Sequence, residues 1–117
     1  MKIVLVGASN DRKKYWNIIL RDLISKWHTV IPVNAKENEI EWIKCYRNIS
    51  LIEELFDVIN IVTPSEITLE ILKQANELWY KKIWCQPWSS DNMVKKYLTD
   101  NDFDYIVDAC IMMEKIN

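Results

Sequence analysis

The sequence predicts an α/β domain in which a doubly wound, parallel five-stranded sheet lies between two layers of helices. Short apolar runs alternate along the chain with longer segments of helical period, and this alternation is typical of parallel strands joined by crossover helices. The chain has 117 residues, of which 50% are hydrophobic and 27% are charged. That length and composition fit one globular domain with its own core. We therefore assign residues 1–117 to a single domain.

Five short apolar runs are the predicted strands. In chain order they are KIVLVG (2–7), TVIPVN (29–34), DVINIVT (57–63), KKIWCQ (81–86) and DYIVDA (104–109). With helices on both faces they make a three-layer, Rossmann-like α/β/α arrangement, for which we expect the strand order 3-2-1-4-5.

The segments between these runs have the period of amphipathic helices, with apolar residues at spacings of three and four. In residues 13–26 the apolar stripe consists of Trp16, Ile19, Leu20, Leu23 and Ile24. In residues 66–78 it consists of Ile67, Ile71, Leu72, Ala75 and Leu78. Helix-start signals occur at TPSE (63–66), where Pro64 takes the first helical position, at SLIE (50–53) and at SSDN (89–92). The first two have the pattern of a capping box.

Ligands in doubly wound sheets bind outside the carboxyl ends of the strands, at the topological switch point. The segments at those ends are Gly7 to Asn10, Val33 to Asn34, Thr63 to Pro64 and Gln86 to Pro87. The turn GASNDRKK (7–14) presents small residues and backbone N–H groups at a helix N-terminus, which is an anion-binding arrangement, and Lys13 and Lys14 supply positive charge. An ordinary strand-to-helix turn has the same composition, so this motif alone leaves both interpretations open.

The sequence contains no recognisable catalytic or metal-binding constellation. An NAD site predicts a carboxylate at the end of the second strand, and Asn34 stands there instead. His28, the only histidine, lies at the start of that strand, where a structural role is favoured. Cys85 lies within a strand and is expected in the core, whereas Cys110 follows the last strand, where a packed thiol is favoured but the side chain is also placed to face a ligand.

Charge and hydropathy exclude other classes of partner. The net charge of -2 and the absence of a Lys/Arg cluster argue against nucleic acid. No stretch approaches the roughly 18 apolar residues of a membrane span. The N-terminal apolar run is too short for a signal peptide, and the 3 cysteines match no disulfide framework, so we expect a reduced, cytoplasmic protein.

Several blocks of the sequence, in order, resemble the small stand-alone coenzyme A-binding proteins, whose Rossmann-type fold is related to the coenzyme A-binding domain of succinyl-CoA synthetase. The blocks are VGAS (6–9), KY (14–15), VIPVN (30–34), KCY (44–46), TP (63–64), WCQP (84–87) and CIMME (110–114). The resemblance covers nearly the whole chain and implies that the cofactor is coenzyme A.

The resemblance also implies where the ligand would lie. The residues around the pyrophosphate would be Gly7, Ala8, Ser9 and Lys14, those bordering the adenosine Val33 and Asn34, and those lining the remaining wall Thr63, Pro64, Gln86 and Pro87. Asn10, from the first of these loops, and Cys110 complete the predicted cofactor-binding residues.

The tryptophan and glycine contents depart from the family. The chain has 6 Trp and 1 Gly, and the resemblance implies glycine at Trp16, Trp27, Trp42, Trp79 and Trp88, leaving Trp84 as the position where the family commonly has Trp. Independently of the resemblance, Trp27 and Trp79 each follow the last apolar residue of a predicted helix, where a left-handed conformation favours Gly. Our hypothesis is that the five are glycines encoded by UGA in an organism that reads UGA as glycine. The alternative is drift with compensating hydrophobic packing.

The sequence therefore predicts a module that binds coenzyme A or an acyl-CoA without catalysis of its own, and has neither nucleic acid nor a membrane as partner. An NAD(P)-binding oxidoreductase-like domain and a subunit of an acyl-CoA ligase are the alternatives. The preferred acyl group, the biological process and the oligomeric state are not indicated.

Overall fold

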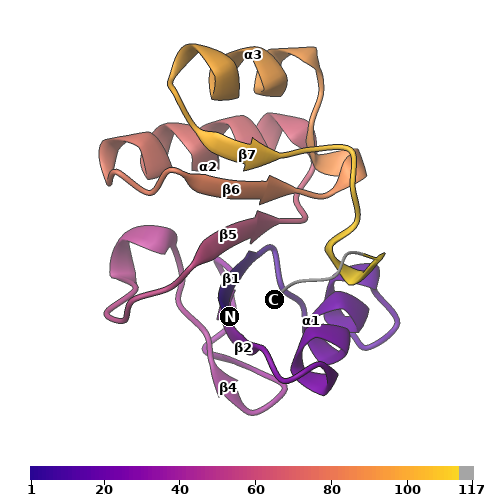
Figure 1. Ribbon diagram of the computed structural model, residues 1–117. Helices are drawn as coiled ribbons and strands as arrows, with labels where there is room; N and C mark the ends of the chain where they lie inside the picture. The colour runs from indigo at the N-terminus through magenta and orange to yellow at the C-terminus, as the bar shows by residue number, and fades with distance from the viewer. Residues whose placement is uncertain (114–117) are drawn as a thin grey trace.

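The computed structural model describes residues 1–113 and contains a five-stranded, entirely parallel sheet (Figure 1). Its strands are β1 (Lys2–Val6), β2 (Thr29–Val33), β5 (Val58–Ile61), β6 (Lys82–Cys85) and β7 (Asp104–Ile106). Each lies within one of the five predicted runs, and nearly every residue of β1, β2, β5 and β6 is buried, as continuous apolar strands of a parallel sheet should be. The α/β fold class is confirmed.

The strand order is β2-β1-β5-β6-β7, which differs from the expected order in one place. The third strand was expected beside the second, but β5 pairs with β1, from Ile3 opposite Val58 to Val6 opposite Ile61. The outer edge of β2 is instead occupied by the returning chain, where Tyr46 N donates to Pro32 O (3.0 Å). Pro32 has no N–H with which to donate a hydrogen bond to a further strand. The proline within TVIPVN therefore indicates an edge strand.

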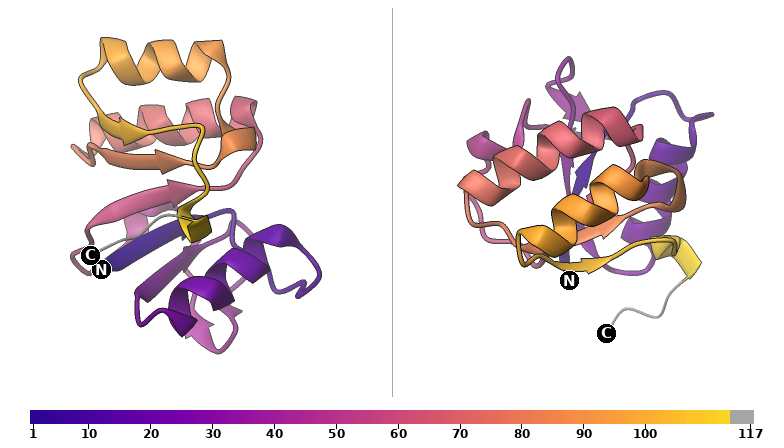
Figure 2. Two further views of the ribbon diagram at one scale, coloured as in Figure 1. Left: turned by 45° about the vertical axis from the view of Figure 1, so that its right-hand side comes forward. Right: turned by 90° about the horizontal axis from the view of Figure 1, so that it is seen from above.

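Helices cover both faces of the sheet (Figure 2). On one face, α1 (Tyr15–Ser25) packs through three fully buried residues, Ile19, Leu20 and Leu23. On the other, α2 (Ser65–Glu77) and α3 (Asn92–Asp100) pack through a second cluster that contains Leu72, Ala75, Val94 and Leu98. The predicted stripes thus face the sheet, except at Ile24, which is 39% exposed near the end of α1, and at Ile67, which is 49% exposed near the start of α2.

The predicted helix starts have mixed outcomes. Asp91 caps α3 by accepting a hydrogen bond from Val94 N (2.9 Å), within the predicted SSDN segment. The predicted capping box at residues 50–53 is wrong, because the 3₁₀ turn η1 (Ile49–Leu51) begins earlier and is capped by Asn48, which accepts from Ser50 N (2.9 Å). Pro64 is the N-cap of α2 rather than its first helical residue, and no side chain caps that helix.

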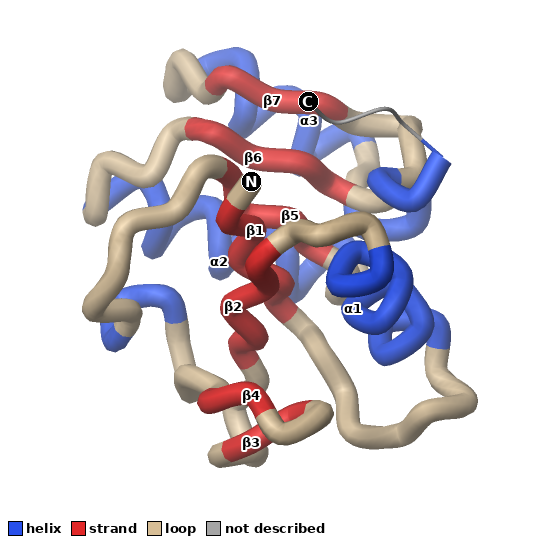
Figure 3. Tube along the Cα trace, turned by 60° about the horizontal axis from the view of Figure 1, so that its bottom comes forward, coloured by secondary structure: helices blue, strands red, loops and turns tan. Residues whose placement is uncertain are grey.

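Between β2 and β5 the chain forms a small hairpin instead of a crossover helix (Figure 3). Its strands, β3 (Glu39–Ile40) and β4 (Ile43–Lys44), have two residues each, too short to give a periodic signal in the sequence. Two further 3₁₀ turns, η2 (Pro87–Ser89) and η3 (Ile111–Met113), lie near the carboxyl ends of β6 and β7. In residues 1–113, none of the helices has the length and apolarity needed to span a membrane.

Candidate functional site

A cleft of about 430 Å³ opens at the carboxyl ends of β1, β2 and β5, and we name it the β1–β5 cleft. After β1 the chain adds β2 on one side of it and then β5, β6 and β7 on the other side. The cleft lies at this reversal, which is the topological switch point of the sheet. The residues lining it are Val6, Gly7, Val33, Asn34, Ala35, Lys36, Arg47, Asn48, Ile49, Thr63, Ile67, Ile71 and Gln74. Of the residues at the predicted strand ends, Gly7, Val33, Asn34 and Thr63 line this one cleft.

Gly7 forms the floor of the cleft and requires the absence of a side chain. Its φ is +97°, and a Cβ there would lie 2.9 Å from Val62 Cγ2 and 3.0 Å from Thr63 Cγ2. Its N–H donates to Val33 O (3.0 Å). The backbone of β1 therefore passes close beneath the cleft, where a ligand can approach main-chain atoms directly.

Asn34 connects two walls of the cleft through its side chain. Its Nδ2 donates to Ala8 O (2.7 Å), and its Oδ1 accepts from Lys36 N (2.7 Å). Ala8 is fully buried, so it contributes to the site through its backbone. The side-chain amide of Asn34 thereby shapes the loops on both sides of it.

The loop from Gly7 to α1 is held by side chains on its outer side. Buried Asn17 donates from Nδ2 to Ser9 O (2.6 Å), and its Oδ1 accepts from Arg21 Nε (2.8 Å). Asn10 donates from Nδ2 to Glu39 O (2.8 Å) and to Glu37 Oε2 (3.0 Å), which ties the loop to the β3–β4 hairpin. Asn10 thus belongs to the framework of the site and is absent from the lining of the β1–β5 cleft.

Positive charge lies near the start of α1. Lys13 and Lys14 are exposed, and their backbone N–H groups bond Asp11. Lys14 is the N-cap residue of α1 without a side-chain capping bond. The first N–H groups of a helix lack intrahelical partners, so this end suits an anion.

Two cations that sequence reasoning missed line the β1–β5 cleft. Lys36 and Arg47 are both exposed, and Arg47 Nη2 donates to Asn38 Oδ1 (3.0 Å). Among the described residues, the lining of the cleft contains these two cations and no carboxylate. Arg47 directly follows the KCY block, but a single arginine in a loop carries no pattern by which its position could be found.

The α2 side of the cleft combines apolar and polar groups. Ile67, half exposed, and Ile71 present aliphatic surface, and Gln74 and Thr63 present polar groups. Thr63 Oγ1 is 2.9 Å from Thr68 Oγ1. Both isoleucines belong to the stripe predicted to face the sheet. Ile71 packs against the second core cluster and also lines the cleft, whereas Ile67 lies near the start of α2 and is half exposed. Pro64, the N-cap residue, is exposed and is not among the residues that line it.

The predicted residues from β6 and the C-terminal segment form a separate group. Gln86 is fully buried, donates from Nε2 to Cys110 Sγ (3.1 Å) and accepts at Oε1 from Ile111 N (3.0 Å). Pro87 is exposed at the start of η2. Gln86 therefore holds the segment that carries Cys110 from a buried position. Cys110 itself is half-buried, and its Sγ lies 3.8 Å from Tyr15 Oη. This contact with Cys110 raises the pKa of the Tyr15 hydroxyl.

Three aromatic side chains gather at the start of α1. The ring of Trp88 lies 5.0 Å from that of Tyr15 and 5.9 Å from that of Trp16, and Trp88 Nε1 donates to Val62 O (2.8 Å). These three rings line a separate hollow of about 290 Å³.

The remaining candidates lie away from the β1–β5 cleft. His28 Nδ1 is 3.3 Å from the N-terminal amine, at the amino ends of β1 and β2, and burial followed by that charge lowers the pKa of His28. Cys85 is fully buried, as expected, and burial raises its pKa to about 12. In the described part of the chain, no group of three or more His, Cys, Asp or Glu residues is arranged to hold a metal ion. A hollow of about 450 Å³ between Glu54 and Lys82 lies at the amino ends of β5 and β6, where sheets of this class do not bind ligands.

Comparison with known proteins identifies the family of the chain. A family model described as "CoA binding domain" matches residues 1–115. The alpha subunit of acetate–CoA ligase (ADP-forming) II of Pyrococcus furiosus is 30% identical over 82 residues, which cover 69% of this chain and 18% of that protein. The chain thus spans less than a fifth of the length of the curated relatives it matches.

Solved structures share the fold over nearly the whole chain. A conserved hypothetical protein from Pyrococcus furiosus is 42% identical, with a TM-score of 0.94, and the match covers 97% of this chain and 98% of that one. The dinucleotide-forming acetyl-coenzyme A synthetase 1 of Ca. Korarchaeum cryptofilum, in complex with phosphate and ADP, is 25% identical with a TM-score of 0.73. That match covers 91% of this chain and 25% of the synthetase.

Proposed function

Because the chain belongs to the family of CoA-binding domains, we propose that it binds coenzyme A or an acyl-CoA as a binding or regulatory module without catalysis of its own. The observation that carries this proposal is the β1–β5 cleft, which joins a side-chain-free floor at Gly7 to two cations, Lys36 and Arg47. Its volume of about 430 Å³ lies in the range of small-molecule sites.

In the proposed complex the adenosine part occupies the β1–β5 cleft. Ile67 and Ile71 offer apolar surface to the adenine ring, and Asn48 and Gln74 offer hydrogen-bonding groups to its edge. Lys36 and Arg47 face the 3′-phosphate, because a phosphate at this wall meets two cations and no lining carboxylate among the described residues.

The pyrophosphate in this proposal crosses Gly7, Ala8 and Ser9 toward the N-terminus of α1, where Lys14 adds charge. The pantetheine arm then continues past Pro64 and Pro87 toward Cys110. Gln86 acts on this part of the site indirectly, through its bonds to Cys110 and Ile111.

Isothermal titration of the chain with coenzyme A and with dephospho-coenzyme A, which lacks the 3′-phosphate, tests the proposal. Both ligands should bind, and coenzyme A should bind more tightly. Arg47→Gln and Lys36→Gln should each weaken coenzyme A binding about tenfold while changing dephospho-coenzyme A binding little, since a charge-assisted contact contributes about 1.5–3 kcal/mol. Lys96→Gln is the control, because Lys96 lies on α3 and pairs there with Asp100. The absence of binding to either ligand would refute the proposal.

The matched ligase subunit supports a second candidate, a subunit of an acyl-CoA ligase. Such a subunit requires a partner that carries a phosphorylatable histidine and a nucleotide site, because His28 lies at the amino ends of β1 and β2 and the cleft lies at their carboxyl ends. A pull-down of the chain from its source, followed by incubation of the chain alone and of the chain with any captured subunit in acetyl-CoA, ADP and phosphate, separates the two, because ATP formed only with a captured subunit would favour the ligase candidate. We expect no ATP from the chain alone, and ATP formation would contradict a module without catalysis.

A further inference from the structure

Three of the tryptophans occupy backbone conformations that favour glycine. Trp27 has φ +69°, Trp42 +67° and Trp79 +62°. In this region a Cβ crowds the following carbonyl oxygen, at a cost of roughly 1–2 kcal/mol per residue. Bulky residues are outliers there, whereas Asn and Asp are enriched, and Asp102 and Asp108 are two of the other positive-φ residues of the described chain.

Trp27 and Trp79 each follow a helix at the position that Gly most often takes. After α1, His28 N donates to Leu23 O (3.1 Å) and Trp27 N to Ile24 O (3.0 Å). These two bonds define a Schellman motif, whose left-handed residue is usually Gly.

The end of α2 repeats the motif. Tyr80 N donates to Ala75 O (2.9 Å), and Trp79 N donates to Asn76 O (3.2 Å). The end of α3 repeats it a third time, with Asp102 at the left-handed position and Phe103 N bonded to Leu98 O (3.1 Å). The chain thus contains an internal comparison between two tryptophans and a residue that tolerates this conformation.

Trp42 occupies the turn between β3 and β4. The two turn residues, Glu41 and Trp42, both have positive φ, +48° and +67°. A two-residue hairpin turn with positive φ at both positions is of type I′, which strongly prefers Gly at the second position.

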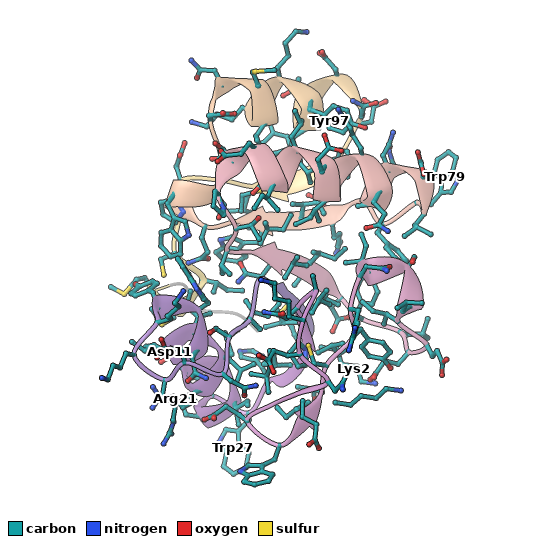
Figure 4. All side chains as sticks on the ribbon, turned by 180° about the vertical axis from the view of Figure 1, so that it is seen from behind. Lys2, Asp11, Arg21, Trp27, Trp79 and Tyr97 are labelled. Carbon is teal, nitrogen blue, oxygen red and sulfur yellow. The ribbon has the colours of Figure 1, made fainter. Side chains whose placement is uncertain are left out.

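None of the three side chains has packing that offsets this cost. The exposed fraction is 94% for Trp27, 93% for Trp42 and 81% for Trp79. Figure 4 shows Trp27 and Trp79 projecting from opposite parts of the molecular surface. Trp79 has one cation–π contact, with Lys81 Nζ 5.5 Å from the ring centroid. The compensating hydrophobic packing that the alternative of drift requires is therefore absent at these three positions.

Trp84 provides the contrast. It lies within β6, is 7% exposed, and donates from Nε1 to Ala109 O (2.8 Å). Its environment fits an indole ring, whereas the environments of Trp27, Trp42 and Trp79 fit a residue without a Cβ.

We propose that positions 27, 42 and 79 are glycine in the natural protein, encoded by UGA in an organism that reads this codon as glycine, and that Trp84 is encoded by UGG. One change in codon meaning places the same wrong residue at all three sites, and it also explains why a chain with 6 Trp has 1 Gly. This inference rests on backbone geometry and is independent of the ligand.

The gene and the natural protein test the inference directly. We expect UGA at codons 27, 42 and 79 and UGG at codon 84, and peptide masses of the protein isolated from its source should show glycine at the three positions. UGG at any of the three codons overturns the inference, as does a peptide in which UGA is read as tryptophan.

A stability series supplies the physical test. In the chain as printed, Trp27→Gly, Trp42→Gly and Trp79→Gly should each raise the folding equilibrium constant at least about fivefold. Asp102→Gly, at the same position of the third Schellman motif, should raise it less. A decrease in any of the three tryptophan variants would contradict the inferred strain.

Discussion

At the scale of single residues, the surroundings of Gly7 leave no room for a side chain. Gly7→Ala places a Cβ against Val62 and Thr63 and keeps φ at +97°, so we expect a loss of about 1–3 kcal/mol in the free energy of unfolding. Denaturant titration measures this loss. Ala8→Gly, next to it in the same loop, should cost less than Gly7→Ala because it removes a methyl group without introducing a clash, and the opposite ranking would contradict the close packing at Gly7.

Asn60 is a second sensitive residue, for a different reason. It is fully buried in β5 between Leu5 of β1 and Trp84 of β6, and both polar atoms of its side chain lack hydrogen-bond partners. An unsatisfied buried polar group costs about 1–3 kcal/mol. Asn60→Val should therefore stabilise the protein by about 1 kcal/mol in thermal or chemical unfolding.

The matched control for that substitution is Ile59→Val, on the other face of the same strand. It deletes a buried methyl group and should cost about 1 kcal/mol. If Asn60→Val instead lowers the free energy of unfolding at least as much as this control does, the amide of Asn60 stabilises the fold, and the expected gain from removing it is wrong.

At the scale of elements, α3 depends on Asp91 in a pH-dependent way. Its carboxylate accepts from Val94 N, and this bond lowers the pKa of Asp91 below its ordinary 3.8. A depressed carboxyl pKa stabilises the folded state above the ordinary pKa, and this stabilisation is lost as the pH falls through the lower folded value. Asp91→Ala should therefore lower the Tm at pH 7, and the difference from the parent should shrink below pH 3.8.

Asp91→Asn separates the cap from its charge, because the amide oxygen can still accept the Val94 N–H bond. At pH 7 the Tm of this variant should lie close to that of the parent. As the pH falls, its Tm should decrease less than that of the parent, because the variant has no carboxyl group at position 91 to protonate. A Tm difference for Asp91→Ala that stays constant from pH 7 to pH 3 would exclude the carboxylate as its source.

The elements also show what sequence patterns can and cannot reveal. The five strands were predicted from short continuous apolar runs, and α1 and α2 from apolar spacings of three and four that extend over more than ten residues. The helix α3 was indicated by its start signal at SSDN. The β3–β4 hairpin was missed because two-residue strands have no period, and the start of η1 was misplaced because Ser50 fits a capping pattern equally well inside the turn. The strand order was wrong, although Pro32 carried the information that β2 is an edge.

The candidate site was only partly predictable for a related reason. Strand ends identify Gly7, Val33, Asn34 and Thr63, since parallel strands bring their carboxyl ends together. Lys36 and Arg47 reach the β1–β5 cleft from the loops before β3 and after β4, and Gln74 reaches it from the last turn of α2. None of these three positions follows from a strand end. The family resemblance implies that Gln86 lines the wall of the site, and in the structure both atoms of its side-chain amide bond the C-terminal segment.

At the scale of the whole molecule, the exposed tryptophans determine how copies of the printed chain behave together. Trp27, Trp42 and Trp79 add apolar surface in three separate places. Replacing all three with glycine should reduce concentration-dependent association, measured by light scattering across a dilution series, because exposed apolar area drives non-specific contact. Equal scattering from the two chains would show that association, if present, uses another surface.

Ligand binding at the site should be visible in global stability. A ligand that binds only the native state raises the free energy of unfolding by about 2.7 kcal/mol at a concentration of 100 times its Kd. Coenzyme A should therefore raise the Tm, and the version with glycine at positions 16, 27, 42, 79 and 88 should shift further, because Trp16 and Trp88 stand beside the proposed pyrophosphate path. A smaller shift in the glycine version would show that the rings of Trp16 and Trp88 contribute to binding.

The indole of Trp84 has a practical consequence as a spectroscopic reporter. Its Nε1–H bonds Ala109 O, directly before Cys110, and its ring is shielded from water. In a chain with glycine at the other five positions, all tryptophan emission arises from this single fluorophore. The wavelength and the quenching of this emission would then report, without any added label, whether the segment around residue 109 stays packed on the sheet or moves away from it when a ligand binds in the cleft.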